Sequence, residues 1–218
     1  MIKRLIYKEL KLCASPLSYF FTLAALLAFV PGYPILLGAF FTTLGIFYSF
    51  LAMRENNDIK YSMLLPVTKA DVVKGKFLFA VFIEACSFIL MSVITLIRML
   101  FLKDFAVYTS NALMCANLSF LGFALLIFGL FNSVFIGGFF KTAFYFSKPF
   151  IAYCVISFAV IVIAETLYHI PGLELVNSFG FDHILPQGAI FCAGIFIFAA
   201  LTLLGLKRSG KTFEKIDL

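Results

Sequence analysis

Long apolar runs separated by short basic connections dominate this chain. Residues 12–53 contain no Asp, Glu, Lys or Arg, and about 20 apolar residues are enough to cross a bilayer. The run therefore predicts two membrane-spanning helices joined by a turn at 31–34, where proline and glycine gather. Further apolar segments predict spans at residues 77–97, 112–135, 149–165 and 184–206. The pattern predicts an all-α membrane protein with six transmembrane helices, forming a single transmembrane domain over residues 1–218.

Glycine and proline predict where two of these helices end or begin. Gly137 and Gly138 follow the fourth span and predict a break, because glycine weakens a helix. Pro149 predicts the start of the fifth span, since the first helical turn has no N–H partner to lose.

The basic residues fall almost entirely on one side of the predicted spans. Of the 17 Lys and Arg residues, only Arg98, which would mark the outer end of the third span, and Lys103 lie on the other side. Short loops rich in Lys and Arg remain in the cytoplasm, so both termini are predicted to be cytoplasmic. Topology and anionic membrane lipid account for the net charge of +6. We therefore expect no nucleic-acid partner.

Composition agrees with a membrane location. The chain is 63% hydrophobic and 13% charged, whereas soluble domains are about 25% charged. It contains 30 phenylalanines and no tryptophan, and we expect most of these rings to face lipid.

Four segments outside the spans complete the predicted architecture. Residues 1–14 place apolar and basic side chains on different faces, which predicts an amphipathic helix lying in the membrane interface, although a plain basic flank fits a segment this short equally well. Residues 54–76 form the longest cytoplasmic connection, and residues 207–218 form a cytoplasmic tail. Residues 166–186 are half apolar and are predicted to be extracellular or to re-enter the outer leaflet.

The connection at 54–76 is predicted to contain a short helix. Asp58 is expected to cap it, its apolar residues recur at helical spacing, and Pro66 ends what precedes it. Thr68 and Asp71 then match a capping box that begins the next helix. This protein has no energy-supplying domain of its own. A short helix on its cytoplasmic side offers a place where a partner protein that supplies the energy could dock.

Glu84 is the one carboxylate predicted deep inside a span, about 10 Å from its start at 1.5 Å per residue. Charges in hydrocarbon are costly, so such residues usually face a cavity or a partner. One interpretation is a residue that lines a translocation path or couples to its movement. The other is a protonated or snorkelling glutamate paired with a lysine such as Lys76.

Small residues recur along one face of the second span at steps of four and three positions. Small side chains allow helices to approach closely in membranes, so the stripe predicts either packing within one subunit or a dimer seam. Its members are Gly38, Thr42, Gly45, Ser49 and Ala52.

Gly205, Gly210, Lys211 and Thr212 match a phosphate-binding loop, but we do not expect ATP to bind there. The first glycine lies inside a predicted span, and six residues follow Thr212, whereas a phosphate-binding loop needs a strand before it and a helix after it.

Other patterns that carry chemistry are weak. Five dispersed cysteines without a C-x-x-C pair predict neither disulfides nor a zinc site and are interpreted as packing residues. Glu165, His169 and His183 gather near the predicted outer end of the fifth span and allow a mixed metal site or a membrane-embedded hydrolase. Interfacial polar residues explain them more simply, so we expect no metal and no catalytic residue.

The stretch from Asp58 to Phe77 resembles the segment after the second span in small permeases of type-2 ABC exporters. Its letters, Tyr-Ser-Met-Leu-Leu-Pro-Val-Thr-Lys-Ala-Asp-Val-Val-Lys-Gly-Lys-Phe, are similar to the family's "sLPvsr..iv..Ky" pattern. The six spans and the basic amphipathic start are similar across essentially the whole chain. The chain departs from antibiotic-sensing subgroups because it has no large extracellular domain.

This resemblance implies the type-2 ABC exporter fold in the plasma membrane of a bacterium. It implies a permease that pairs with a second permease, identical or different, and with separate ATPase subunits that bind ATP and Mg. Small members export amphipathic peptides such as phenol-soluble modulins or bacteriocins, so peptides or other apolar molecules are the implied cargo. The resemblance also implies a coupling helix that docks on the ATPase, formed by Asp58, Ile59, Lys60, Tyr61, Ser62, Met63, Leu64, Leu65 and Pro66. The alternative is the membrane-embedded hydrolase or an accessory membrane protein.

Overall fold

The computed structural model describes residues 2–109, 113–142, 144–181 and 183–216, and every regular element in them is helical. The first half contains α1 (Ile2–Lys8), the π-helical turn η1 (Glu9–Cys13), α2 (Pro16–Thr22), the 3-10 helix η2 (Leu23–Phe29), α3 (Leu37–Glu55), α4 (Asp58–Met63) and α5 (Lys69–Phe101). The second half contains α6 (Ala106–Thr109), α7 (Leu118–Leu130), the π-helical η3 (Phe131–Ile136), α8 (Gly137–Lys141), α9 (Ser147–Thr166), the 3-10 turns η4 (Leu167–His169) and η5 (Glu174–Val176), and α10 (Ile184–Glu214).

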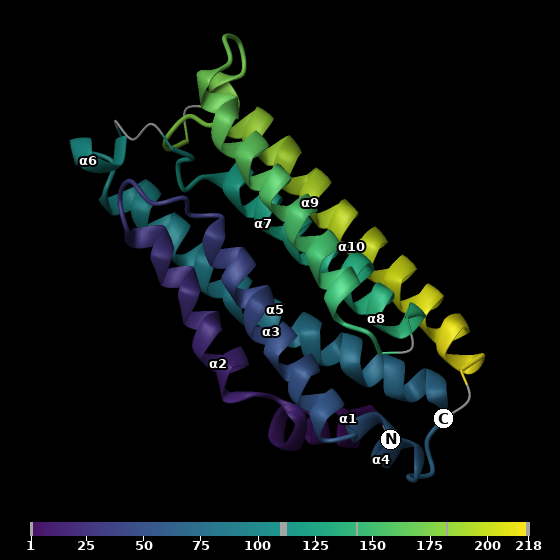
Figure 1. Cartoon of the computed structure of the whole chain (residues 1–218). Helices are drawn as coiled ribbons and strands as arrows, with labels where there is room; N and C mark the ends of the chain where they lie inside the picture. The colour runs from purple at the N-terminus through teal and green to yellow at the C-terminus, as the bar shows by residue number, and fades with distance from the viewer. Residues whose placement is uncertain (1, 110–112, 143, 182, 217–218) are drawn as a thin grey trace.

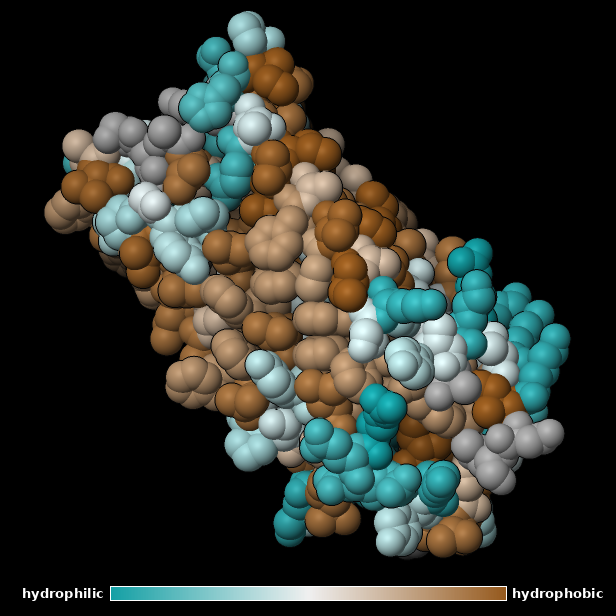
Figure 2. Space-filling model, viewed as in Figure 1, coloured by the Kyte–Doolittle hydropathy of each residue, from teal (hydrophilic) through white to brown (hydrophobic). Residues whose placement is uncertain are grey.

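The long helices form two neighbouring groups, as Figure 1 shows. α2, α3 and α5 lie together, while α7, α9 and α10 lie beside them, and α10 packs along α7 and also contacts α5. The two chain ends, α1 and α4 lie at one end of the molecule, and α6 lies at the other. A hydrophobic band crosses the middle of the surface, with hydrophilic side chains at both ends (Figure 2). This is the surface of a protein whose middle lies in hydrocarbon.

Five helices among the described residues are long and apolar enough to cross a membrane, namely Leu37–Glu55, Lys69–Phe101, Leu118–Lys141, Ser147–Thr166 and Ile184–Glu214. The predicted first span is different. Leu5–Cys13 and Pro16–Phe29 bend by 93° relative to each other, and together they make a sixth candidate. Pro16–Phe29 is half α and half 3-10 helix, so it is about 25 Å long, which is near the thickness of the bilayer core.

Local capping fixes where several helices begin. Ser15 accepts a hydrogen bond from the Leu17 N–H and precedes Pro16 at the first helical position. The predicted capping box is confirmed, because Thr68 and Asp71 satisfy each other's backbone N–H groups at the start of α5.

The predicted break at Gly137 and Gly138 is wrong. The helix runs on from Leu118 to Lys141. A Cβ atom on Gly138 would lie 2.7 Å from the Cβ atom of Pro149, so this glycine permits a close approach between α8 and the first turn of α9. The start of the fifth span is confirmed to within two residues, since α9 begins at Ser147.

Arg98 lies inside the protein near the end of α5. The helix continues to Phe101, and the Arg98 side chain is buried. Its guanidinium donates a hydrogen bond to the carbonyl of Ala28 and lies 4.8 Å from the ring centre of Tyr108. A basic residue expected at the outer boundary therefore holds η2 and α6 against α5.

Many phenylalanine rings pack inside the protein, whereas most of them were expected from the sequence to face lipid. Twelve of them are buried and seven are exposed. Phe47 stacks on Phe150 with ring centres 3.7 Å apart, and Phe135 packs edge-on against Phe50 and Phe150. Aromatic packing of this kind joins α3, η3 and α9.

Candidate functional site

The predicted short helix in the connection at 54–76 is present as α4. Asn57, in the left-handed conformation with φ of 51°, turns the chain out of α3 into α4. The capping role expected of Asp58 is wrong, because Asp58 is the first helical residue and forms no cap. Its carboxylate forms ion pairs instead, and charge-assisted bonds are stronger than a bond to one backbone N–H.

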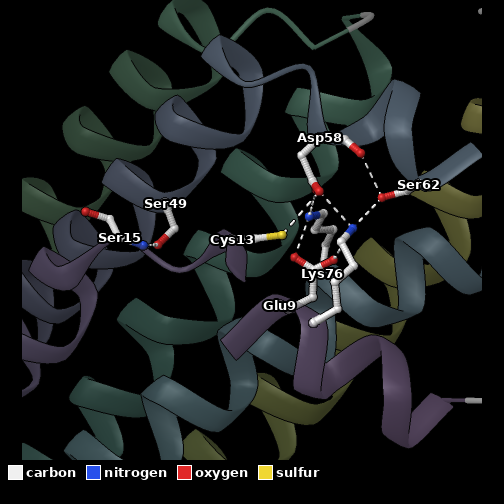
Figure 3. Close-up of polar contacts among 8 residues, drawn as sticks. Glu9, Cys13, Ser15, Ser49, Asp58, Ser62 and Lys76 are labelled. Atoms are coloured by element: carbon white, nitrogen blue, oxygen red, sulfur yellow. Dashed lines mark hydrogen bonds and ion pairs between the residues drawn. The ribbon is translucent and has the colours of Figure 1, made fainter. Parts of the chain in front are cut away.

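A buried cluster of four charged side chains fastens α4 to the rest of the protein. Lys76 of α5 forms ion pairs with Glu9 of η1 and with Asp58. Lys8 of α1 lies 2.8 Å from the Asp58 carboxylate and also contacts Glu9. Figure 3 shows these side chains converging from three separate segments of the chain. The two ammonium groups balance the two carboxylates, so the cluster is neutral overall.

Two uncharged groups complete the cluster. The Ser62 hydroxyl donates a hydrogen bond to the backbone carbonyl of Asp58 and accepts one from Lys8. The Cys13 thiol donates to Asp58 Oδ1 at 3.2 Å, so the interpretation of Cys13 as a packing residue misses a polar contact. Burial would raise the pKa of Asp58, but Lys76, with Lys8 and Cys13, lowers it to about 2. Asp58 is therefore charged at neutral pH.

The outward side of α4 and the two residues that follow it form an open, mostly apolar surface, on which Lys60 is the exposed charged residue. Tyr61, Leu64 and Leu65 are exposed, and Leu64 exposes 81% of its surface. They border a groove of about 510 Å³ whose other wall includes Leu12, Met53 and Asn56. Ile59 is buried, and Met63 is half-buried against the core. The predicted docking residues thus divide into an inner set that holds the helix and an outer set that is available to a partner.

The cluster also brings together ligand atoms of Glu9, Cys13 and Asp58 within 4.8 Å of one another. This is the one such group of three in the part of the chain that the structure describes. Lys76 and Lys8 already occupy the carboxylates with positive charge, and an added cation would meet both ammonium groups. We therefore interpret it as an ion-pair cluster.

Glu84 lies buried in the middle of α5, but its expected pairing with Lys76 is wrong. Lys76 is engaged at the end of the helix, and Glu84 Oε2 instead accepts a hydrogen bond of 2.9 Å from the amide of Asn132 in η3. The same amide donates to the Thr202 hydroxyl of α10 at 3.1 Å. Glu84 Oε1 and Asn132 Oδ1 are buried and have no hydrogen-bond partner among the residues that the structure describes. This polar contact joins three helices inside the membrane region.

The small-residue face of α3 packs inside the subunit. A Cβ atom on Gly45 would lie 2.8 Å from Phe21 Cβ, and one on Gly38 would lie 2.9 Å from the carbonyl oxygen of Ala24. Ser49 accepts a hydrogen bond from the N–H of Ser15 (Figure 3) and shares another with the Ser18 hydroxyl. Thr42 lies 2.7 Å from the Ser87 hydroxyl, and Ala52 is half-buried. The small-residue stripe was predicted to serve either packing within one subunit or a dimer seam. These contacts support packing within the subunit.

Glu165, His169 and His183 do not form a group of ligand atoms by the same distance criterion, within the described residues. Glu165 accepts a hydrogen bond of 2.6 Å from the N–H of Met114, so it ties the start of the α7 segment to the end of α9. Asp182, which precedes His183 in the sequence, lies outside the described residues.

The four residues that match a phosphate-binding loop in the sequence lie within a continuous helix. Gly205, Gly210, Lys211 and Thr212 all belong to α10, so no loop forms there to cradle phosphates.

Sequence reasoning missed Lys8, Glu9 and Asn132. Lys8 was counted only as a topology signal, and Glu9 is an acidic residue in a basic segment, which could have indicated a partner. Asn132 is the one amide between residues 118 and 140, and a polar residue in a span usually has a partner.

The fold and the site define an α-helical, multi-pass membrane protein. At one end of the molecule, a buried ion-pair cluster holds the short helix α4, whose outer side is exposed. Residues 4–213 match the model of the ABC-2 family transporter protein, and the chain belongs to this family. It is therefore the membrane component of an ABC transporter, a class that works with ABC ATPase subunits. No curated protein and no solved structure matched the chain.

Proposed function

We propose that this chain is the permease subunit of an ATP-driven exporter and that α4 is the coupling helix that docks on a partner ATPase. The observation that carries the proposal is the division of α4 into two sides. Its inner side is fastened through Asp58 to Lys76, and its outer side presents Tyr61, with Leu64 and Leu65 exposed directly after the helix. Exposed apolar side chains gathered beside a groove are typical of a protein interaction site.

The ion-pair cluster gives this docking site a mechanical connection to the membrane. Lys76 lies in the second turn of α5, which is 33 residues long and therefore extends about 50 Å. A movement of α4 would be transmitted to α5 through the Asp58–Lys76 ion pair and to α1 through the Asp58–Lys8 ion pair. ATP and Mg would be bound by the partner, and this chain would convert the partner's movement into a tilt of its spans.

We also propose a bacterial plasma membrane as the location, with both termini cytoplasmic. The chain ends and α4 lie at one end of the molecule (Figure 1), and the Lys and Arg bias of the sequence favours that end as the cytoplasmic one. Reporter fusions after Lys69, Ser147 and Leu218 should report inside, and fusions after Lys103 and Asp182 outside. An extracellular Lys69 fusion would make docking of a cytoplasmic ATPase impossible.

The cargo class that we propose is an amphipathic or hydrophobic peptide, or another apolar molecule, exported by this chain together with a second permease. The resemblance to small toxin exporters supports it. So does a groove of about 420 Å³ along α2, η2 and α3, lined by Phe20, Phe21, Leu23, Ala24, Leu26, Leu27, Val30 and Phe41. Glu84 is the residue we propose beside the path, and Glu84→Gln should lower export while expression stays normal.

Co-purification with the ATPase and cargo-stimulated ATP hydrolysis test the coupling role. Tyr61→Asp with Leu64→Asp should weaken the complex and lower stimulation, because a charge placed in an apolar interface is costly. The inserted protein should keep its unfolding temperature, since both side chains are exposed.

Leu185→Asp is the matched control. Leu185 is as exposed as Leu64 but lies at the start of α10, at the opposite end of the molecule. Unchanged assembly and stimulation in the α4 variant, or equal losses in the control, would refute the coupling role of α4.

A further inference from the structure

A groove of about 460 Å³ separates the first turns of α5 from the last turns of α10. The two helices are held together on either side of it. A Cβ atom on Gly205 would lie 3.3 Å from the Phe77 ring, and Lys69 Nζ donates a hydrogen bond of 2.7 Å to the backbone carbonyl of Ile216. The groove is therefore a fixed feature of the helix crossing.

The lining of this groove changes from apolar to basic along α10. Leu203 and Leu206 lie toward the membrane, while Lys207 and Lys211 follow one and two turns later. Lys74 of α5 adds a third exposed ammonium, and Glu214 is the one carboxylate in the lining. Leu203 and Lys211 are about 12 Å apart along the helix axis, which is comparable to the distance from lipid phosphate to the upper acyl chain.

Gly210 leaves the middle of the groove open. A Cβ atom placed on Gly210 would meet no atom within 4 Å. Gly210 and Lys211 are the residues that imitate a phosphate-binding loop in sequence. In the helix they place an open space beside an ammonium group, on the wall of a groove whose other residues, apart from Glu214, are apolar or basic.

We propose that this groove binds one anionic glycerophospholipid, with the phosphate between Lys207, Lys211 and Lys74 and one acyl chain along Leu203 and Leu206. Basic pockets between membrane helices bind anionic head groups, and lysines at helix ends direct their ammonium groups to the interface. The apolar half of the groove distinguishes a lipid from a soluble phosphate, which would use the lysines alone. The proposal rests on the membrane class of the chain and is independent of export and of cargo.

Native mass spectrometry of the full-length protein, with phosphatidylglycerol and phosphatidylcholine as probes, tests the proposal. We expect one phosphatidylglycerol to remain bound under conditions that remove phosphatidylcholine, and this lipid to raise the unfolding temperature. Lys207→Gln with Lys211→Gln should weaken phosphatidylglycerol binding roughly 30-fold, since each basic side chain near an anionic head group contributes about tenfold or less.

Gly210→Leu separates a groove from a general basic surface. Leucine is a better helix former than glycine, and its Cβ atom would meet no atom of the described residues within 4 Å, so the protein should fold while the rest of the side chain fills the groove and every charge is kept. Lipid binding should fall as it does in the lysine variant. Gly188→Leu, at the other end of α10 and equally open, controls for the helix effect, and Lys141→Gln with Lys148→Gln controls for charge.

Four results would overturn the proposal. The first is equal retention of the two lipids. The second is equal loss in the control lysine variant, which would mean nonspecific attraction to a basic end. The third is complete competition by glycerol phosphate, which would mean a soluble phosphate site. Displacement of the lipid when the partner ATPase binds, with no lipid bound in the complex, would assign the groove to that protein and would also refute a resident lipid.

Discussion

Asp58 of α4 and Lys76 of α5 form an ion pair in the interior of the protein, at the end where the two chain termini meet. A helix of six residues is too short to be stable by itself. Contacts with other elements must therefore hold α4 in a fixed orientation. The Asp58–Lys76 ion pair is one of these contacts.

Removing Lys76 should destabilise this end of the protein. Lys76→Met leaves the Glu9 and Asp58 carboxylates with the single ammonium of Lys8, and an uncompensated buried charge costs about 3–5 kcal/mol. Chemical denaturation in lipid nanodiscs measures the loss. Lys76→Met with Glu9→Gln restores the charge balance and should recover a large part of it. Equal stability of the single and double variants would mean that packing, and not charge balance, holds α4.

Acid should weaken the same contact in a defined range. The Asp58 pKa is lowered from 3.8 to about 2 because, although burial opposes ionisation, Lys76 stabilises the carboxylate. A lowered pKa adds stability above the unfolded value, and this stability disappears as the pH falls toward the folded value. The difference in unfolding temperature between wild type and Asp58→Asn should be constant above about pH 5 and should shrink as the pH falls from about 5 to about 2.

Asp104→Asn provides the control for this pH series. Asp104 is exposed near the opposite end of the molecule, so its substitution should change the unfolding temperature little at any pH. A difference for Asp58→Asn that is independent of pH down to 2 would show that its charge does not contribute to stability.

The sequence predicts the helices better than it predicts their contacts. A membrane span is recognised from a run of about 20 neighbouring residues, and the start of α5 is recognised from Thr68 and Asp71. Both features can therefore be predicted from residues that are close together in the sequence. Lys76 and Glu9 are 67 positions apart, and no local pattern relates them. Gly138 was misread for the same reason, because the residue that requires it to be small, Pro149, lies on the next helix.

Asn132 should contribute to stability mainly by satisfying Glu84. Asn132→Leu leaves the Glu84 carboxyl buried without its donor, which costs about 1–3 kcal/mol. Glu84→Leu with Asn132→Leu removes both polar groups and should be more stable than Asn132→Leu alone. Denaturation of the two single variants and the double variant gives their coupling free energy, which we expect to be about 0.5–3 kcal/mol. Strictly additive losses would mean that the hydrogen bond between them contributes nothing.

The closest approach between α7 and α10 occurs at Gly122 and Gly194 and should tolerate no side chain. A Cβ atom on Gly194 would lie 2.5 Å from the Gly122 carbonyl oxygen and 2.7 Å from its Cα atom. These are backbone atoms, so relief requires α10 to move away from α7, along which it packs (Figure 1). We expect Gly194→Ala to lower the free energy of unfolding by about 1–3 kcal/mol, the usual cost of overpacking.

Gly188→Ala is the control on the same helix. Its Cβ atom would meet no atom of the described residues within 4 Å, so the variant should be neutral or stabilising by up to about 1 kcal/mol, because alanine favours the helix. Denaturation of both variants in the same nanodiscs checks this, and a Gly194→Ala protein as stable as the Gly188→Ala protein would mean that α7 and α10 are not packed this closely.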